Sequence, residues 1–223
     1  MLTGLTDRVN KIERNYGWVV TGVSGTSISM TYRKQVELVF DIAGFRPNQQ
    51  NQSIDLWYIA DNREIKPVPK TATHDFFLES IRDQIRALPQ SQTPVAKLLS
   101  VVQAGWDKAI AVSSQTSNLN VTFPTTVSRT SDSAMSITSS LLLVPLETRV
   151  EAVLHLHSRG GVEGLEIGIT AEARVIYGEH FNVGKIGEFL VTRIGDALGA
   201  ETEEWSAVMM ELHRRLIARG RKQ

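Results

Sequence analysis

The chain has 223 residues, which is enough for one large domain or two small ones. Its 24 basic and 24 acidic side chains balance, so no overall field favours nucleic acid or an anionic membrane as a partner. The absence of cysteine excludes disulfides, thiolate metal sites and cysteine nucleophiles. No apolar run approaches the ~20 residues that a membrane span needs. This composition favours a protein that binds other proteins or small molecules, and we expect no cofactor.

The first residues carry apolar side chains spaced three, four and three apart, at Leu2, Leu5, Val9 and Ile12. This spacing predicts a helix over residues 2–15. Because fewer than two heptads are present, the helix is either the end of a coiled coil or the first helix of the domain.

Four short segments with alternating apolar residues follow, and the links between the first three are only a few residues long. Short links favour antiparallel pairing of neighbouring strands. The predicted strands are Gly17–Val23, Ser27–Arg33, Val36–Ile42 and Ser53–Ala60. Residues 61–73, which include Pro67 and Pro69, predict a loop.

Two helices are predicted in the middle of the chain. Thr73 is a good N-cap for a helix that runs to Leu88 and is ended by Pro89. A longer helix, Thr93–Asn118, opens with a threonine and a proline in their preferred places. We expect this long helix to be shared by two halves of the chain, with Trp106 in the joint between them.

The pattern of strands followed by helices then repeats. The predicted strands are Val121–Ser128, Met135–Val144, Arg149–His157 and Leu165–Ile176, and the predicted helices are Val183–Leu198 and Thr202–Arg219. The last strand shows the clearest alternation, because apolar residues occupy every second position from Leu165 to Val175.

A strand-to-helix corner is predicted directly after that strand. Gly178 suits the turn, because glycine reaches positive φ without a Cβ clash. Asn182 is a plausible N-cap for the next helix. Tyr177 and Phe181 flank the turn, so we expect them to hold the helix against the end of the sheet.

The two halves follow the same order of elements, although their sequences show no obvious identity. Runs of strands followed by helices indicate an α+β fold with helices on one face of each sheet. The repetition resembles a tandem pair of RWD domains, each a four-stranded antiparallel meander. We place them at residues 1–92 and 93–223, joined by the long helix.

Residues that could carry chemistry are few. His155 and His157 share one face of a predicted strand, a spacing that can supply two zinc ligands. With no cysteine to complete such a site, the pair is more simply interpreted as two solvated surface histidines. The glycine-rich stretch Ser158–Gly161 is followed by a strand, whereas a phosphate cradle needs a helix there. We therefore expect no metal site and no enzyme activity.

Short motifs spread over most of the chain carry a family resemblance. They are Gly17-Trp18, Ile28–Arg33, Val36–Asp41, Leu98-Leu99 with Trp106, Tyr177–Asn182 and Lys185–Leu190. In this order and spacing they resemble the C-terminal module of the outer-kinetochore scaffold family, the kinetochore-null or spindle-pole-component-seven proteins of the KMN network.

This resemblance implies a non-catalytic docking module that anchors a scaffold to the MIND complex in the nucleus, at kinetochores. It implies capture of the C-terminal tail of one MIND subunit, and pairing of an upstream coiled coil with a small coiled-coil partner. RWD domains resemble ubiquitin-conjugating enzymes, but the chain lacks the cysteine that those enzymes use, and it lacks the Tyr-Pro-x-x-x-Pro turn of ordinary RWD domains. An RWD adaptor in ubiquitin or translation-control signalling, and a small-molecule binder or enzyme with an α+β fold, are the alternatives.

The fourth predicted strand offers a candidate contact patch. Asp55 is not expected to face a core, so Trp57 and Ile59 should point away from the helices. The last strand of a meander is also an edge that can accept an added peptide strand. We therefore predict that Trp57 and Ile59, with Val39 and Arg33, bind the MIND tail. The alternative is that Trp57 packs against the second domain or the first helix.

Overall fold

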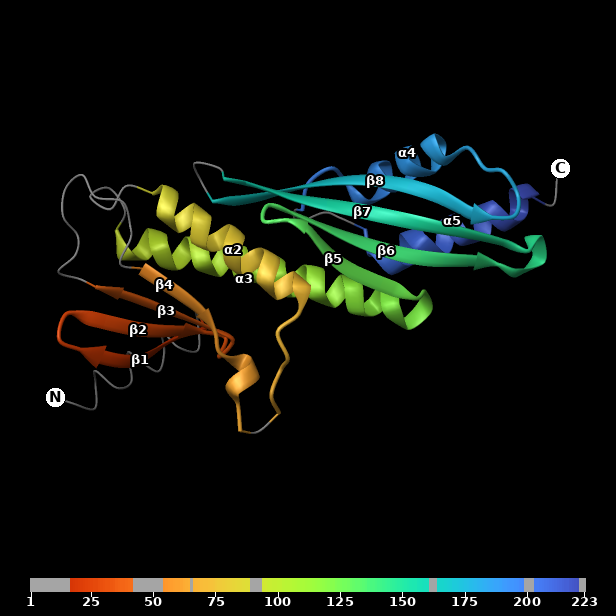
Figure 1. Cartoon of the computed structure of the whole chain (residues 1–223). Helices are drawn as coiled ribbons and strands as arrows, with labels where there is room; N and C mark the ends of the chain where they lie inside the picture. The colour runs from red at the N-terminus through yellow and green to blue at the C-terminus, as the bar shows by residue number, and fades with distance from the viewer. Residues whose placement is uncertain are drawn as a thin grey trace. The chain divides into compact units, whose positions relative to one another are not determined.

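The computed structural model describes residues 17–41, 54–64, 66–88, 94–160, 164–198 and 203–220. Within these ranges the fold is α+β, with two four-stranded antiparallel sheets and four α-helices, which confirms the predicted class (Figure 1). The chain divides into two compact units, Met1–Ala104 and Gly105–Gln223. The helix predicted over residues 2–15 lies outside the described residues. None of the described helices is long and apolar enough to cross a membrane.

The first sheet is a meander with its strands in the order β1-β2-β3-β4. These strands are β1 (Trp18–Ser24), β2 (Ser27–Tyr32), β3 (Val36–Asp41) and β4 (Ile54–Tyr58). The prediction that β2 reaches Arg33 is wrong, because Arg33 and Lys34 adopt positive φ values of 48° and 55° and form the turn to β3. Two successive left-handed residues give a turn whose twist matches that of the flanking strands. Strand β4 also ends before Ala60, which begins a short 3-10 helix, Ala60–Asn62.

One face of this sheet forms the core of the first unit. Its buried side chains are Trp18, Tyr32, Val36, Leu38, Phe40, Leu56 and Tyr58. Helix α2 (Ala72–Ala87) packs against β4, and its predicted apolar residues Phe77, Ile81 and Ile85 are at most 2% exposed. Burial of these aromatic and aliphatic side chains holds the helix on the sheet.

The N-cap of α2 is Thr71, and the prediction of Thr73 in this role is wrong. The Thr71 hydroxyl accepts a hydrogen bond from the backbone N–H of His74 at 3.4 Å. In return, Nδ1 of His74 accepts one from the backbone N–H of Thr71 at 3.2 Å. Thr73 lies inside the helix and is 3% exposed. Each of the two bonds satisfies a backbone donor that has no partner within the helix.

The capping role of His74 predicts a pH-dependent stability. Burial lowers the pKa of His74, and the charge of Asp75 opposes this effect only in part. The unfolded chain therefore binds the proton more readily than the folded chain, and stability is lost as the pH falls through the unfolded pKa of about 6.5. We expect the free energy of unfolding, measured in urea, to decrease between about pH 7.5 and pH 5.5 more steeply in the wild type than in His74→Gln. Glutamine at this position keeps the capping acceptor but does not titrate. Equal slopes in the two proteins would contradict the assignment.

Helix α3 (Val95–Thr122) has 28 residues and overlaps the predicted long helix from Val95 to Asn118. It continues past Asn118, so the prediction that a strand begins at Val121 is wrong. The helix ends directly before Phe123 and Pro124, where proline cannot supply a backbone donor for a further turn. Its buried residues are Leu98, Val101, Val102, Trp106, Ala109, Val112 and Leu119. The division between the two units falls inside this helix.

The second sheet is also a meander, in the order β5-β6-β7-β8. Its strands are β5 (Thr125–Ser131), β6 (Ala134–Leu143), β7 (Thr148–Gly160) and β8 (Leu165–Tyr177). On β8, Leu165, Ile167 and Ile169 are buried and their neighbours are more exposed, as the alternation predicts. One edge strand of each sheet carries a register shift, between Val20 and Gly22 on β1 and between Arg129 and Ser131 on β5.

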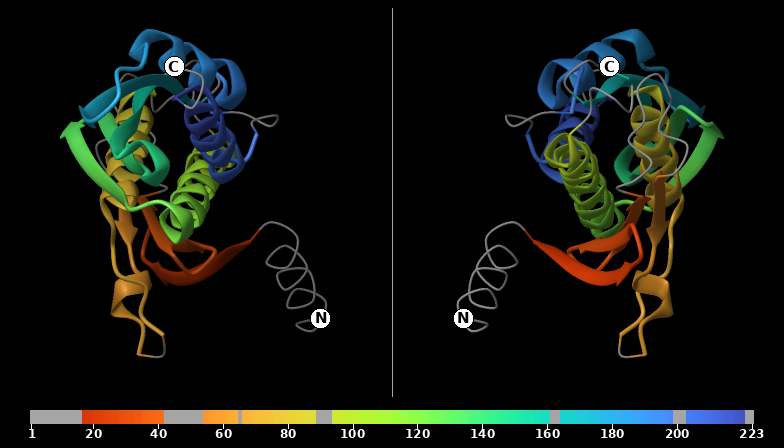
Figure 2. Two further views of the ribbon diagram at one scale, coloured as in Figure 1. Left: turned by 90° about the vertical axis from the view of Figure 1, so that its right-hand side faces the viewer. Right: turned by 90° about the vertical axis from the view of Figure 1, so that its left-hand side faces the viewer.

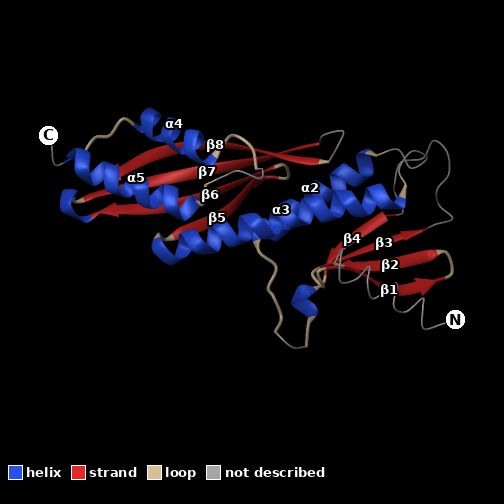
Figure 3. Cartoon of the chain, turned by 180° about the vertical axis from the view of Figure 1, so that it is seen from behind, coloured by secondary structure: helices blue, strands red, loops and turns tan. Residues whose placement is uncertain are grey.

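Helices α4 (Val183–Ile194) and α5 (Trp205–Gly220) complete the second unit. Helix α5 lies behind the sheet in Figure 1 and in front of it in Figure 3, so it covers one face, and α4 contacts both β8 and α5 (Figure 2). The buried side chains of the two helices are Ile186, Leu190, Ile194, Trp205, Val208, Met209, Leu212 and Leu216. The predictions that α4 reaches Leu198 and that α5 begins at Thr202 are wrong. Gly195, at φ 93°, ends α4.

The residues after α4 cover part of the free edge of β8. The backbone N–H of Ile169 donates to Asp196 at 2.7 Å, and that of Leu198 donates to Ile167 at 2.9 Å. Gly187 of α4 lies over the next edge carbonyl, because a Cβ on it would be 3.0 Å from the Ala171 oxygen. From Ile167 to Ala171, the edge of β8 is therefore covered by the chain itself.

Candidate docking surface

Among the described residues, strand β4 pairs only with β3, so it is an edge of the first sheet. Its side chains alternate between the core and solvent. Leu56 and Tyr58 are 2% and 8% exposed, whereas Trp57 is 52% exposed. Trp57 therefore projects from the face opposite the core, as its alternation with Leu56 predicts.

The strand register determines which side chains surround this tryptophan. Glu37 on β3 is the cross-strand neighbour of Trp57, and Val39 is the neighbour of Asp55. The Thr21 hydroxyl donates to the Glu37 carboxylate at 3.1 Å. We call Trp57, Asp55, Glu37 and Val39 the Trp57 surface. It is aromatic and apolar in part, and its two charged members are acidic, so it suits a partner that brings apolar and basic side chains.

Arg82 of α2 reaches around the edge of β4 to this surface. Its Nε donates to the Leu56 carbonyl at 2.9 Å, and its guanidinium carbon lies 5.5 Å from the centre of the Trp57 ring. Glu79 pairs with the same guanidinium at 2.6 Å. A cation at this distance is attracted by the face of the indole. Arg82 therefore orients Trp57 and occupies an edge carbonyl that an added strand would need.

Ile59 and Arg33 lie outside the strands, whereas Trp57 and Val39, the other two predicted contact residues, lie on β4 and β3. Ile59 follows β4, is half-buried, and donates its backbone N–H to Gln35 at 2.9 Å. Nε of Arg33 donates to the Tyr32 hydroxyl at 3.1 Å, and Tyr32 belongs to the core face. The structure thus groups Trp57 with Val39 and does not bring Arg33 to the same face. Arg82, which sequence reasoning missed, takes that position.

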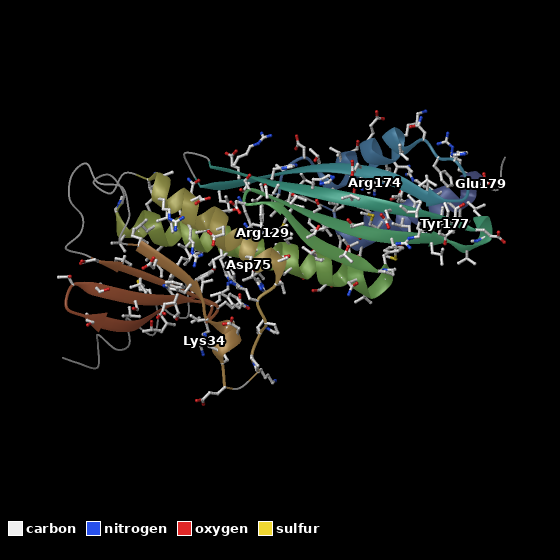
Figure 4. The ribbon with its side chains drawn as sticks, in the orientation of Figure 1. Lys34, Asp75, Arg129, Arg174, Tyr177 and Glu179 are labelled. Atoms are coloured by element: carbon white, nitrogen blue, oxygen red, sulfur yellow. The ribbon has the colours of Figure 1, made fainter. Side chains whose placement is uncertain are left out.

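The predicted corner after β8 has the backbone geometry that the sequence indicates. Gly178 has φ 97°, and the Asn182 side chain accepts a hydrogen bond from the backbone N–H of Lys185 at 3.0 Å, so Asn182 caps α4. Tyr177 is 50% exposed at the end of β8, close to Glu179 (Figure 4), and Phe181 is half-buried. The anchoring role of Tyr177 and Phe181 stays a prediction.

A polar network on the second sheet was not predicted. Nδ1 of His155 lies 2.9 Å from the Ser136 hydroxyl, and its Nε2 lies 3.4 Å from the Glu172 carboxylate. The hydrogen bond from Arg174 is the largest influence on Glu172 and lowers its pKa; burial opposes this, and His155 lowers it further. His155 is thus half-buried and hydrogen-bonded, and 28% of its side chain remains exposed. Ser136 is 6% exposed, so its hydroxyl is out of reach of a substrate, and the network acts as a cross-strand contact.

The remaining candidates for chemistry are structural as well. Residues Ser158–Gly160 are the end of β7 and pair with β8, which begins at Leu165, so the glycine-rich stretch is followed by a strand, as predicted. In the parts of the chain that the structure describes, no three histidine, aspartate or glutamate side chains are placed to hold a metal.

Comparison with known families agrees with a binding surface rather than a reaction centre. Residues 3–113, about half of the chain, match the family described as Knl1 RWD C-terminal domain. The match contains the whole Trp57 surface and α2, whereas the corner at Gly178 lies outside it. No curated protein matches the chain. Domains of this family are non-catalytic protein-interaction modules of the kinetochore, which implies a nuclear location. The chain belongs to the Knl1 family of kinetochore scaffold proteins and carries its C-terminal RWD module.

Proposed function

We propose that the chain is the docking module by which a KMN-network scaffold is anchored to the MIND complex during chromosome segregation. In this proposal it binds the C-terminal tail of one MIND subunit through the Trp57 surface. The observation that carries the proposal is a tryptophan that is 52% exposed on an edge strand, inside the part of the chain that matches the family. Tryptophan is enriched among residues that dominate binding energy.

The proposal includes a tandem RWD-like organisation, with domains at residues 1–92 and 93–223 joined by α3. Two observations support it. Each compact unit contains one four-stranded antiparallel meander, and helices pack on one face of each sheet. Helix α3 is continuous across the division between the units. Residues 2–15 would continue an upstream coiled coil that pairs with a second partner.

The contacts around β4 also suggest how the tail is bound. Because Arg82 occupies the Leu56 carbonyl, an added strand cannot pair with β4 at this position without displacing a charged side chain. The outer face remains accessible. The charged members of the Trp57 surface are Glu37 and Asp55, and the nearby Arg82 is already paired with Glu79. We therefore propose that the tail lies across the face, with an apolar side chain against Trp57 and basic side chains next to the two carboxylates.

Replacing Trp57 tests this proposal directly. We expect Trp57→Ala to weaken the binding of a synthetic MIND tail peptide by about 2 kcal/mol, or roughly 30-fold in Kd, measured by titration calorimetry. The loss follows from the indole area that the peptide would cover. Ile59→Ser should have a smaller effect, because Ile59 is half-buried and lies beyond the end of β4.

Val23→Ala is the matched control. Val23 is 69% exposed on β1, at the opposite edge of the same sheet, so its truncation should leave the affinity unchanged. Circular dichroism checks that each variant is folded. Wild-type affinity in folded Trp57→Ala would contradict the proposal and would move the interface to the second unit.

A further inference from the structure

The second unit contains a notch where β6 extends beyond its neighbour. Strand β5 pairs with β6 only from Ala134 to Ser139, so the segment from Ser140 to Leu143 has β7 on one side and no strand on the other. The backbone N–H of Ser140 donates to Pro124 at 2.9 Å. Nε2 of His213, from α5, lies 3.0 Å from the Leu142 carbonyl and must carry the proton, because a carbonyl only accepts.

The notch encloses a cavity of about 400 Å³, within the ~300–1,000 Å³ range of ligand pockets. It is lined by Thr122, Phe123, Pro124, Ser140, Leu142, Met210, His213 and Arg214. Two of its apolar side chains are accessible from solvent, Leu142 at 51% and Met210 at 37%. The rings of Phe123 and His213 meet at 5.9 Å. The cavity therefore offers apolar walls to an incoming side chain.

Hydrogen-bond donors gather at the rim of this cavity, and none of the lining residues is acidic. Among the described residues, no carboxylate pairs with Arg214, whereas the adjacent Arg215 pairs with Glu211 at 2.5 Å. The N–H of Ser140 and the carbonyl of Leu142 both make hydrogen bonds on the open side of β6, so the backbone groups of its even-numbered residues point into the notch. No described residue accepts a hydrogen bond from the N–H of Leu142. Arg214 and Leu142 both line the cavity, and a guanidinium together with a backbone N–H is complementary to a carboxylate.

We propose that this notch is a second docking site, which binds an acidic peptide segment of a protein partner. One bulky apolar side chain of the segment fills the cavity, and a neighbouring carboxylate accepts hydrogen bonds from Arg214 and from the N–H of Leu142. The site goes beyond the Trp57 surface: it lies in the second unit, and its charge preference is opposite.

The test uses the full chain labelled with ¹³C at the methionine methyl groups. Met210 lies in the notch, and Met30 on β2 serves as an internal reference; Met210→Leu assigns the first signal. The probe is an acetylated, amidated pentapeptide, Glu-Asp-Phe-Asp-Glu. Its matched probes are Gln-Asn-Phe-Asn-Gln, which has no charge, and Glu-Asp-Gly-Asp-Glu, which has no apolar side chain.

We expect the acidic phenylalanine probe to shift the Met210 signal in a saturable manner and to leave Met30 unchanged. Each matched probe should bind at least about fivefold more weakly, as should the acidic probe to Arg214→Gln. Arg215→Gln is the control next in sequence and should bind as the wild type does. A second variant, Leu142→Glu, places a carboxylate at the notch and should also abolish the shift.

Three results would overturn the proposal. The first is the absence of a Met210 shift with the acidic probe at several millimolar. The second is an equal shift with the uncharged probe, which would indicate apolar contact alone. The third is unchanged affinity in both Arg214→Gln and Leu142→Glu.

Discussion

Replacing Gly178 by valine is expected to destabilise the protein by about 3 kcal/mol or more, since backbone strain and steric overlap each cost about 1–3 kcal/mol. Gly178 has φ 97°, and a Cβ at this position would lie 2.2 Å from Oγ1 and 2.6 Å from Cα of Thr148. Thr148 is fully buried, and its hydroxyl donates to Leu146 at 2.7 Å and accepts from the backbone N–H of Glu179 at 2.8 Å. The valine would therefore displace the residue that holds both sides of the corner.

Gly25→Val separates the two causes. Gly25 also has positive φ, 60°, but a Cβ there would meet nothing within 4 Å. In this control, the free energy of unfolding should fall only by the cost of a left-handed backbone, about 1–2 kcal/mol. Urea unfolding of both variants gives the comparison. Equal losses at the two glycines would show that the contact with Thr148 is unimportant.

Trp106→Ala is expected to cost about 3–5 kcal/mol, the usual range for truncating a buried aromatic side chain. Trp106 is fully buried on α3 and is one of the largest enclosed side chains in the protein. The control is Val121→Ala on the same helix. Val121 is 88% exposed, so its loss should change the free energy of unfolding by less than about 0.5 kcal/mol.

Calorimetry of Trp106→Ala also tests whether α3 joins two RWD-like domains. Helix α3 continues without a break across the division between the units, and a helix that loses its packing at one end loses cooperative stability along its length. We expect one transition, at a lower temperature than in the wild type. Two separate transitions, of which only one moves, would contradict the idea of a shared helix.

Much of the fold could be predicted because burial follows periodicity. The alternation on β8 and the stripe on α2 indicate which side chains face a core before any neighbour is known. The first and last residues of the helices were harder to predict. Thr71 and Thr73 are both suitable caps by residue type, and the choice depends on His74, whose ring replaces the glutamate or glutamine usual in a capping box. The predicted end of α4 at Leu198 is too late because a glycine commonly follows the end of a helix, and this segment offers two such glycines, Gly195 and Gly199.

Only part of the candidate docking surface could be predicted from the sequence, for a similar reason. The exposure of Trp57 follows from its own strand, so local alternation was sufficient. The direction of the Arg33 side chain could not be predicted from strand alternation, because Arg33 lies in the turn after β2. Arg82 lies 26 residues away from the Leu56 carbonyl that it contacts, and the hydrogen bond between Ser136 and His155 depends on strand register. A single sequence carries no local signal for contacts of this kind.

Each of the four edge strands of the described sheets carries a feature that hinders pairing with a further strand along part of its length. Strands β1 and β5 are interrupted by irregular register, Arg82 occupies a carbonyl of β4, and the segment after α4 covers β8. An open edge is a template on which copies of a protein polymerise into fibres. These features oppose strand-to-strand aggregation where many copies of the chain are concentrated, while the outer side chains of its sheets remain available to other proteins.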